Sequence, residues 1–339
     1  MKRLSFAPLA LLVLGACVNN SPPASTPPQG QGQPNLYGPQ QPQAGYPQQP
    51  QYPQQPQYPQ QPQYPQQPQP PTVQPRPLLA PLVGSPAMQQ EVRGIMSELI
   101  AALPATYQAK VKGIPLQFQA TNEINAYAGC ENGSAFMAGT EGFLSAADAI
   151  AQTKATDELF GTQTYDAYTA QVLPQIVKSE SSVNPALPAG IIPAQYLANP
   201  QRLSRARELF GDVVAFTFGH ELGHHYLGHT GCANGQAPNP LLSIASHVIP
   251  AWSQVYESQA DQAGCVDALD AGRNRRPNYR WSEKGGVILL DFFARLERAA
   301  GGGLFNPLNL LRSHPYPGIR IPFVQQTAQD WYRRNPGVQ

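Results

Sequence analysis

Hydrophobic residues are spaced differently in the two parts of this chain. Residues 18–77 contain few aliphatic side chains, whereas residues 78–339 carry apolar positions at helical and strand spacing. A helix is predicted for residues 91–103, where the apolar positions are Val92, Ile95, Leu99 and Ile100. Residues 78–339 are enough for one domain with its own core.

The same spacing predicts a mostly helical α+β fold with a small strand element. Residues 114–145 have the pattern of short strands and a hairpin, and clusters of Pro and Gly at 183–200 and 233–240 mark loops. Further helices are predicted for residues 208–226, 248–269, 286–298 and 325–334.

The segment before this domain is predicted to be a disordered linker. Residues 17–77 have no charged side chain before Arg76, and Tyr recurs every six residues in Pro/Gln units from Tyr46 to Tyr64. Such a composition cannot bury a core and favours extended, polyproline-like chain. The simplest role is a spacer, and binding of peptidoglycan or a partner is the alternative.

The first 16 residues have the pattern of a secretory signal. Two basic residues precede an apolar stretch that is too short to span a bilayer, and small residues lead to Cys17. This pattern predicts a bacterial lipoprotein signal, with cleavage before Cys17 and acylation of that residue. Val18 follows Cys17, which suggests the outer membrane, facing the periplasm. No later stretch reaches 18 apolar residues, so the lipid would be the only anchor.

Chemistry is most evident in the sequence His220-Glu221-Leu222-Gly223-His224, which follows an apolar run. On a helix, residues four apart share one face, so both imidazoles could bind one Zn²⁺. Glu221 would lie beside that face, where it could take a proton from a zinc-bound water.

A zinc site of this type needs a third protein ligand. Positions 227 and 230 are Leu and Thr, which excludes the metzincin arrangement, and a straight helix would turn His225 and His229 away from the pair. A second helix offers Glu257 instead, as in gluzincins. Asp261 lies one turn later, where it could hold the free N–H of a ligating histidine.

These motifs resemble the HtpX-like and CAAX-prenyl-protease-like zinc peptidases, which are gluzincins. The likeness covers roughly residues 85–325 and includes His229 five residues after the motif, the strand-like Asn125–Ala128 and His314 in a Ser-His-Pro sequence with Arg320. It implies a zincin-type metallopeptidase domain with His314 near the metal, as an oxyanion stabiliser or as a capping ligand. About sixty residues separate Leu144 from the zinc-binding helix, where the family has a short helix.

Cysteine and charge add two expectations. With Cys17 acylated, Cys130, Cys232 and Cys265 remain, and an oxidising periplasm permits a disulfide. A Cys232–Cys265 bridge is compatible with two helices that meet at the metal, and it would leave Cys130 free. The net charge of +1 gives no electrostatic case for nucleic acid.

Together these observations predict a lipid-anchored zinc endopeptidase. Its protein or peptide substrate would add as an extended strand near Asn125–Ala128. The alternative, from a different class, is a chaperone-like or binding lipoprotein that keeps a zinc site but cleaves little. The intact Glu221 argues against it, because a pure binder has no use for a general base.

Overall fold

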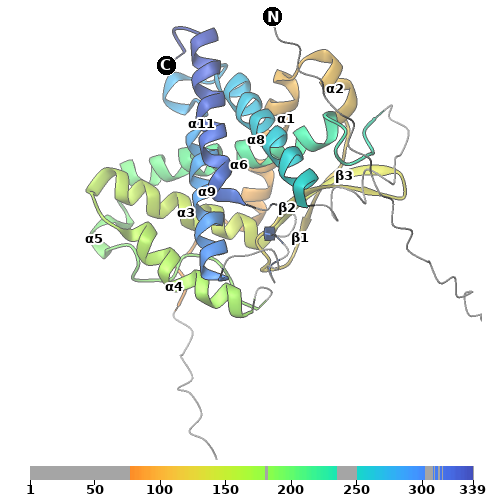
Figure 1. The fold of residues 1–339 in the computed structure, drawn as a ribbon. Coiled ribbons are helices and arrows are strands. Elements are labelled where there is room, and N and C mark those ends of the chain that lie inside the picture. The colour runs from red at the N-terminus through yellow and green to blue at the C-terminus, as the bar shows by residue number, and fades with distance from the viewer. Residues whose placement is uncertain are drawn as a thin grey trace, which may run out of the picture. The chain divides into compact units, whose positions relative to one another are not determined.

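A long central helix, α6 (Pro200–Tyr226), organises the computed structural model (Figure 1). The structure describes residues 77–179, 182–234, 250–301, 308, 310–311, 314 and 316–338. The predicted signal peptide and the linker up to residue 76, Cys17 included, lie outside these ranges. From residue 209 to residue 223 every side chain of α6 is buried, which is the pattern of a helix surrounded on all sides.

Local sequence explains where α6 begins. The side chain of Asn199 accepts a hydrogen bond from the Arg202 N–H, and Pro200 occupies the first turn, where its missing N–H costs nothing. The helix therefore starts eight residues before the predicted 208. The Arg202 guanidinium is buried and bonds to the carbonyls of Tyr196 and Leu197, which fixes the incoming loop.

The other predicted helices are present, and each is somewhat longer than predicted. Helix α6 packs against α1, α3 (Glu141–Phe160), α8 and α9, and α11 packs on α8 and α9. Figure 1 shows α11 upright beside these two helices. The bounds are α1 (Ser85–Ala102), α8 (Pro250–Gly272), α9 (Lys284–Ala299) and α11 (Pro317–Arg334), with the short α2 (Ala105–Val111), α5 (Ala194–Leu197) and 3₁₀ helix η1 (Pro277–Tyr279).

The predicted strand region forms a three-stranded sheet. Strands β1 (Leu116–Gln119), β2 (Ala126–Glu131) and β3 (Ser134–Thr140) have the order β1-β3-β2, with β1 parallel and β2 antiparallel to β3. Asn132 and Gly133 both have positive φ and join β2 to β3 in a two-residue hairpin. The strand order makes β2 an edge strand, as the expected addition of a substrate strand near Asn125–Ala128 requires.

Two helices fill the stretch between the sheet and α6. Helix α3 (Glu141–Phe160) starts where the Thr140 side chain caps the Phe143 N–H, so the predicted strand region ends at 140 and not at 145. Gly161, with φ of 63°, ends α3, and α4 (Thr164–Lys178) follows. The long insertion is thus largely a pair of packed helices, with α3 lying against α6.

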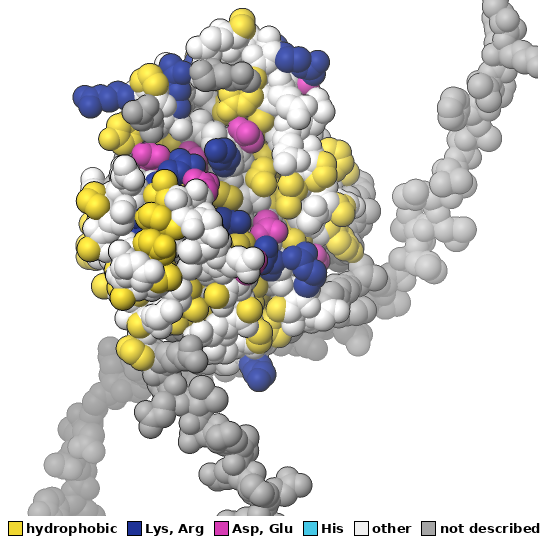
Figure 2. Space-filling model, turned by 90° about the vertical axis from the view of Figure 1, so that its left-hand side faces the viewer, with side chains coloured by type: hydrophobic (Ala, Val, Ile, Leu, Met, Phe, Trp, Pro, Cys, Tyr) yellow, Lys and Arg dark blue, Asp and Glu magenta, His cyan; other side chains and the backbone are white. Residues whose placement is uncertain are grey.

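The face turned to the viewer in Figure 2 mixes Lys and Arg with Asp, Glu and hydrophobic side chains, and no histidine is visible on it. Among the helices that the structure describes, none is both long and apolar enough to cross a membrane. The described part of the molecule is thus a mostly helical α+β domain, with its histidines placed elsewhere than on this face.

Candidate metal centre

Glycines bring α6 and α8 unusually close together. A Cβ on Gly264 would lie 2.6 Å from the His220 backbone nitrogen, and a Cβ on Gly219 would lie 3.1 Å from the Gly264 Cα. Position 264 has no room for a larger residue, and a Cβ at position 219 would require the Gly264 backbone to shift by a few tenths of an ångström. The close packing of the two helices places Glu257 beside His220.

Four buried or nearly buried side chains from three segments of the chain converge on one point. His220, His224, Glu257 and His314 each offer a donor atom, and these atoms all lie within 4.8 Å of one another. The Nε2 atoms of His220 and His224 are 3.0 Å apart, and the nearer Glu257 oxygens are 3.5 Å and 3.2 Å from them. Two nitrogens bound to one zinc ion at tetrahedral angles would lie roughly 3.3 Å apart.

The hydrogen bonds on the far sides of the two rings are compatible with Nε2 atoms that are free to bind a cation. The Nδ1 atom of His220 lies 3.0 Å from Asp261, and that of His224 lies 3.1 Å from His229. If each Nδ1 carries the proton, both Nε2 atoms present lone pairs to each other and to a carboxylate. Burial alone would lower the pKa of His220, but the carboxylates of Glu257 and Asp261 outweigh it and raise this pKa.

Asp261 and Arg320 form a buried ion pair that contacts His220 and Glu257 of this centre. The Arg320 guanidinium donates to both Asp261 oxygens, each at 2.6 Å, and its Nη1 lies 3.0 Å from Glu257. Burial would raise the pKa of both carboxyl groups. For Asp261 the main opposing influence is Arg320, and for Glu257 it is His314 followed by Arg320, so both pKa values are lowered. Asp261 therefore lies next to a histidine of the cluster, as predicted, whereas the sequence indicated no role for Arg320.

Glu221 lies beside the donor cluster and is tied to the sheet. Its Oε2 accepts a hydrogen bond of 2.7 Å from the Ala128 N–H of strand β2. Its Oε1 is 4.0 Å from the His220 Nε2 and 3.9 Å from the His314 Nε2. Burial raises the pKa of Glu221, which makes its carboxylate a stronger base than an exposed one.

His314 comes from the segment before α11 and completes the set. Its Nδ1 lies 2.7 Å from Glu257, and its buried Nε2 has no hydrogen-bond partner in the described structure. A proton on Nδ1 would leave Nε2 with a free lone pair, and a buried polar atom of this kind normally has a partner. The neighbouring residues 313 and 315 of the predicted Ser-His-Pro motif lie outside the described residues.

The expectation that His229 faces away from the pair is wrong. Helix α6 ends at Tyr226, and Gly228, with φ of 88°, reverses the chain. His229 therefore returns to the His224 ring, at 5.1 Å between centroids, and is only 6 % exposed. His225, by contrast, does turn away, and bonds to Phe136 and Thr230.

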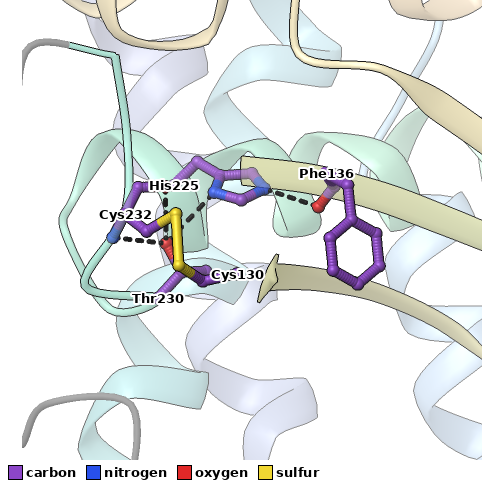
Figure 3. Close-up of a disulfide and its surroundings, with 5 residues drawn as sticks. All are labelled: Cys130, Phe136, His225, Thr230 and Cys232. Atoms are coloured by element: carbon purple, nitrogen blue, oxygen red, sulfur yellow. Dashed lines mark hydrogen bonds between the residues drawn. A yellow bond between two sulfur atoms is a disulfide. The ribbon is translucent and has the colours of Figure 1, made fainter. Parts of the chain in front are cut away.

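The expected Cys232–Cys265 bridge is also wrong. Cys130 of β2 is bonded to Cys232, with Cα atoms 5.7 Å apart (Figure 3). Cys265 is a buried free thiol facing the Val324 carbonyl. The reversal after α6 carries Cys232 toward the sheet and not along α8. Closing a loop of about 100 residues stabilises the folded chain by on the order of 4–5 kcal/mol in the chain-entropy model.

Comparisons of the chain with protein-family models, with curated proteins and with solved structures found no match. The class of protein is therefore defined by the fold and the site: a mostly helical α+β domain whose buried His/Glu group could bind a metal ion.

Proposed function

We propose that this protein is a zinc-dependent endopeptidase with a zincin-type domain. The observation that carries the proposal is the convergence of two histidines and Glu257 on one point, with Glu221 held beside it by the sheet. Nitrogen donors in the majority favour zinc over calcium or magnesium, which prefer all-oxygen sites. Zinc, when bound, would supply a polarised water and a Lewis acid for the scissile carbonyl.

Glu221 is the proposed general base. Its Oε2 is fixed by the Ala128 N–H, which leaves Oε1 to accept a proton from the attacking water and to return it to the leaving amine. Its protonation is eased by burial, which raises its pKa. A hydrogen bond from the strand thus sets the direction in which the base points.

The edge of β2 is the proposed place for the substrate backbone. The N–H of Ala128 points to Glu221 and away from β3, so Ala126, two residues earlier in the strand, directs its backbone groups to the same free side. An extended peptide added at this edge would pass directly by the general base. A small apolar pocket lies next to His220 and Glu221; its walls include Ala126, Phe143, Phe216, Leu289, Leu290 and Phe293.

Peptide hydrolysis by purified full-length protein should disappear after zinc is removed by a chelator and return when zinc is added. The measurement is cleavage of an unfolded protein substrate, with metal content determined for each sample. Undiminished cleavage by metal-free protein would contradict the proposal.

The second candidate is a chaperone-like or binding lipoprotein with a zinc site. The observation in its favour is His314, because a fourth protein donor would close the coordination that a catalytic zinc keeps open. The same assay separates the two functions: a binder would hold the unfolded substrate and leave it intact. A free Nε2 lone pair suits His314 for this capping position better than for donating a hydrogen bond to an oxyanion.

We also propose that the chain is anchored through Cys17 in the outer membrane, facing the periplasm, and that envelope proteins are its substrates. The Cys17→Ser variant should lose fatty-acid labelling and leave the detergent phase, because a lipid would be its only anchor. Metabolic labelling with a fatty-acid analogue and detergent partitioning measure this. A variant that still fractionates with outer membranes would indicate a protein partner instead.

A further inference from the structure

The two α6 histidines of the candidate centre, His220 and His224, have different hydrogen-bond partners on the ring side away from the donor cluster. The Nδ1 of His220 meets the carboxylate of Asp261, which is the common arrangement for a metal-binding histidine. The Nδ1 of His224 instead meets the Nδ1 of His229, at 3.1 Å. A neutral imidazole is an unusual acceptor for this position.

The hydrogen bonds determine which atom carries each proton. His224 directs its Nε2 to Glu257 and to the Nε2 of His220, so a ligating His224 keeps its proton on Nδ1. That proton can be donated only if the Nδ1 of His229 is unprotonated. The proton of His229 then lies on Nε2, which is 3.0 Å from the Gln259 Oε1 and donates to it. The order of donors therefore runs from His224 through His229 to Gln259.

His229 is held in place by contacts that do not depend on a metal. Its backbone N–H donates to the His224 carbonyl at 2.8 Å, and its ring stacks on Tyr256 with centroids 4.4 Å apart. Gln259 and Tyr256 both belong to α8, on either side of Glu257. The loop after α6, which carries His229, is held in two ways. One is the Cys130–Cys232 disulfide, and the other is the pair of hydrogen bonds of Thr230 with His225 and Cys232 (Figure 3).

We infer that His229 is a positioning residue that fixes the tautomer and ring orientation of His224 for metal binding. The inference rests on the metal site of the proposed function and does not require hydrolysis. The centre would then be supported unequally, with His220 held by a carboxylate–arginine pair and His224 held by an imidazole–amide pair. Loss of an outer partner of this kind typically weakens metal binding about 10–100-fold.

A matched pair of substitutions tests this inference in the full-length protein. Leu and Asn are similar in size, but the Asn Oδ1 lies near the place of the histidine Nδ1 and can accept from His224. We expect His229→Leu to weaken zinc binding about 10–100-fold and His229→Asn to recover most of that loss. The measurement is competition for zinc with a chromophoric chelator at constant pH.

The control is His225→Leu. It makes the same substitution at the buried histidine that follows His224 in the chain, whose ring bonds to Phe136 and Thr230. It should lower thermal stability without metal, as His229→Leu should. It should leave zinc affinity within about threefold of wild type, because it removes no hydrogen-bond partner of His224 and because the Cys130–Cys232 disulfide still holds the loop after its bond to Thr230 is lost. The visible spectrum of the Co²⁺-loaded protein should change for His229→Leu and stay unchanged for His225→Leu.

Three outcomes would overturn the inference. One is unchanged zinc affinity in His229→Leu, another is equal weakening in both leucine variants, and the third is no recovery with Asn. Wild-type protein that binds no zinc would overturn the metal site as well. Wild-type protein that binds zinc normally but cleaves nothing would contradict only the proposed peptidase activity.

Discussion

Glu221→Gln should bind zinc and fold like the wild-type protein but hydrolyse peptides about 10²–10⁴-fold more slowly. The amide oxygen of Gln can still accept the hydrogen bond from the Ala128 N–H, so the side chain should keep its place. It cannot take up a proton near neutral pH. The substitution therefore removes the general base and leaves the donor cluster of His220, His224 and Glu257 intact.

The measurement is the rate of peptide cleavage under single-turnover conditions, beside zinc content and thermal unfolding for both proteins. Comparable cleavage rates in the variant would mean that another group accepts the proton. If the variant lost zinc as well as activity, the slower cleavage would reflect weaker metal binding and not the loss of a general base. The zinc content is therefore measured in the same experiment.

Glu257→Ala should lose zinc more completely than any variant of an outer residue. Among the residues that the structure describes, Glu257 is the only carboxylate whose oxygens lie within 3.5 Å of both His220 and His224. Its removal leaves His220, His224 and His314 as donors. It also takes away the carboxylate that faces the Arg320 Nη1, while Asp261 still binds the guanidinium. We expect a fall in zinc affinity beyond the roughly 10–100-fold that follows loss of an outer partner.

His314→Ala is the matched comparison for this prediction. It removes the fourth donor of the cluster but keeps both histidines of α6 and Glu257, so its effect on zinc affinity should be much smaller. Glu257→Gln, which keeps the shape of the side chain, separates loss of the ligand from loss of folding. Equal zinc loss in the alanine variants would show that the third ligand is misassigned.

The sequence pattern predicted helices that bury only one face, and it predicted site residues that lie close together in the sequence. Helix α9 and the His220–His224 motif are examples, because their apolar or polar positions repeat at the helical period. Helix α3 was missed, since Asp148, Gln152, Thr153 and Thr156 are buried beside alanines and leave no polar face to detect. Its buried polar groups are satisfied by local bonds, such as that from Gln152 to Asp148.

The errors near the site share one physical cause, the reversal of the chain after Tyr226. A straight continuation of α6 would place His229 on the far face and Cys232 along α8. Gly228 and Gly231 both have positive φ and redirect the segment toward His224 and the sheet. Gly228 and Gly231 could have indicated this reversal from the sequence, because a glycine just beyond a helix often ends it.

The Cys130–Cys232 bond also changes what a break in the backbone would do. The residues between these cysteines, at a sequence separation of 102, form a covalent ring that includes β3, α3, α4, α5 and α6. A single cut inside the ring, for example at the exposed residues Ser182 or Asn184, would leave both pieces joined. Nicked protein would then migrate as one chain on a non-reducing gel and as two after reduction, with β2 and the donors of α6 still attached to each other.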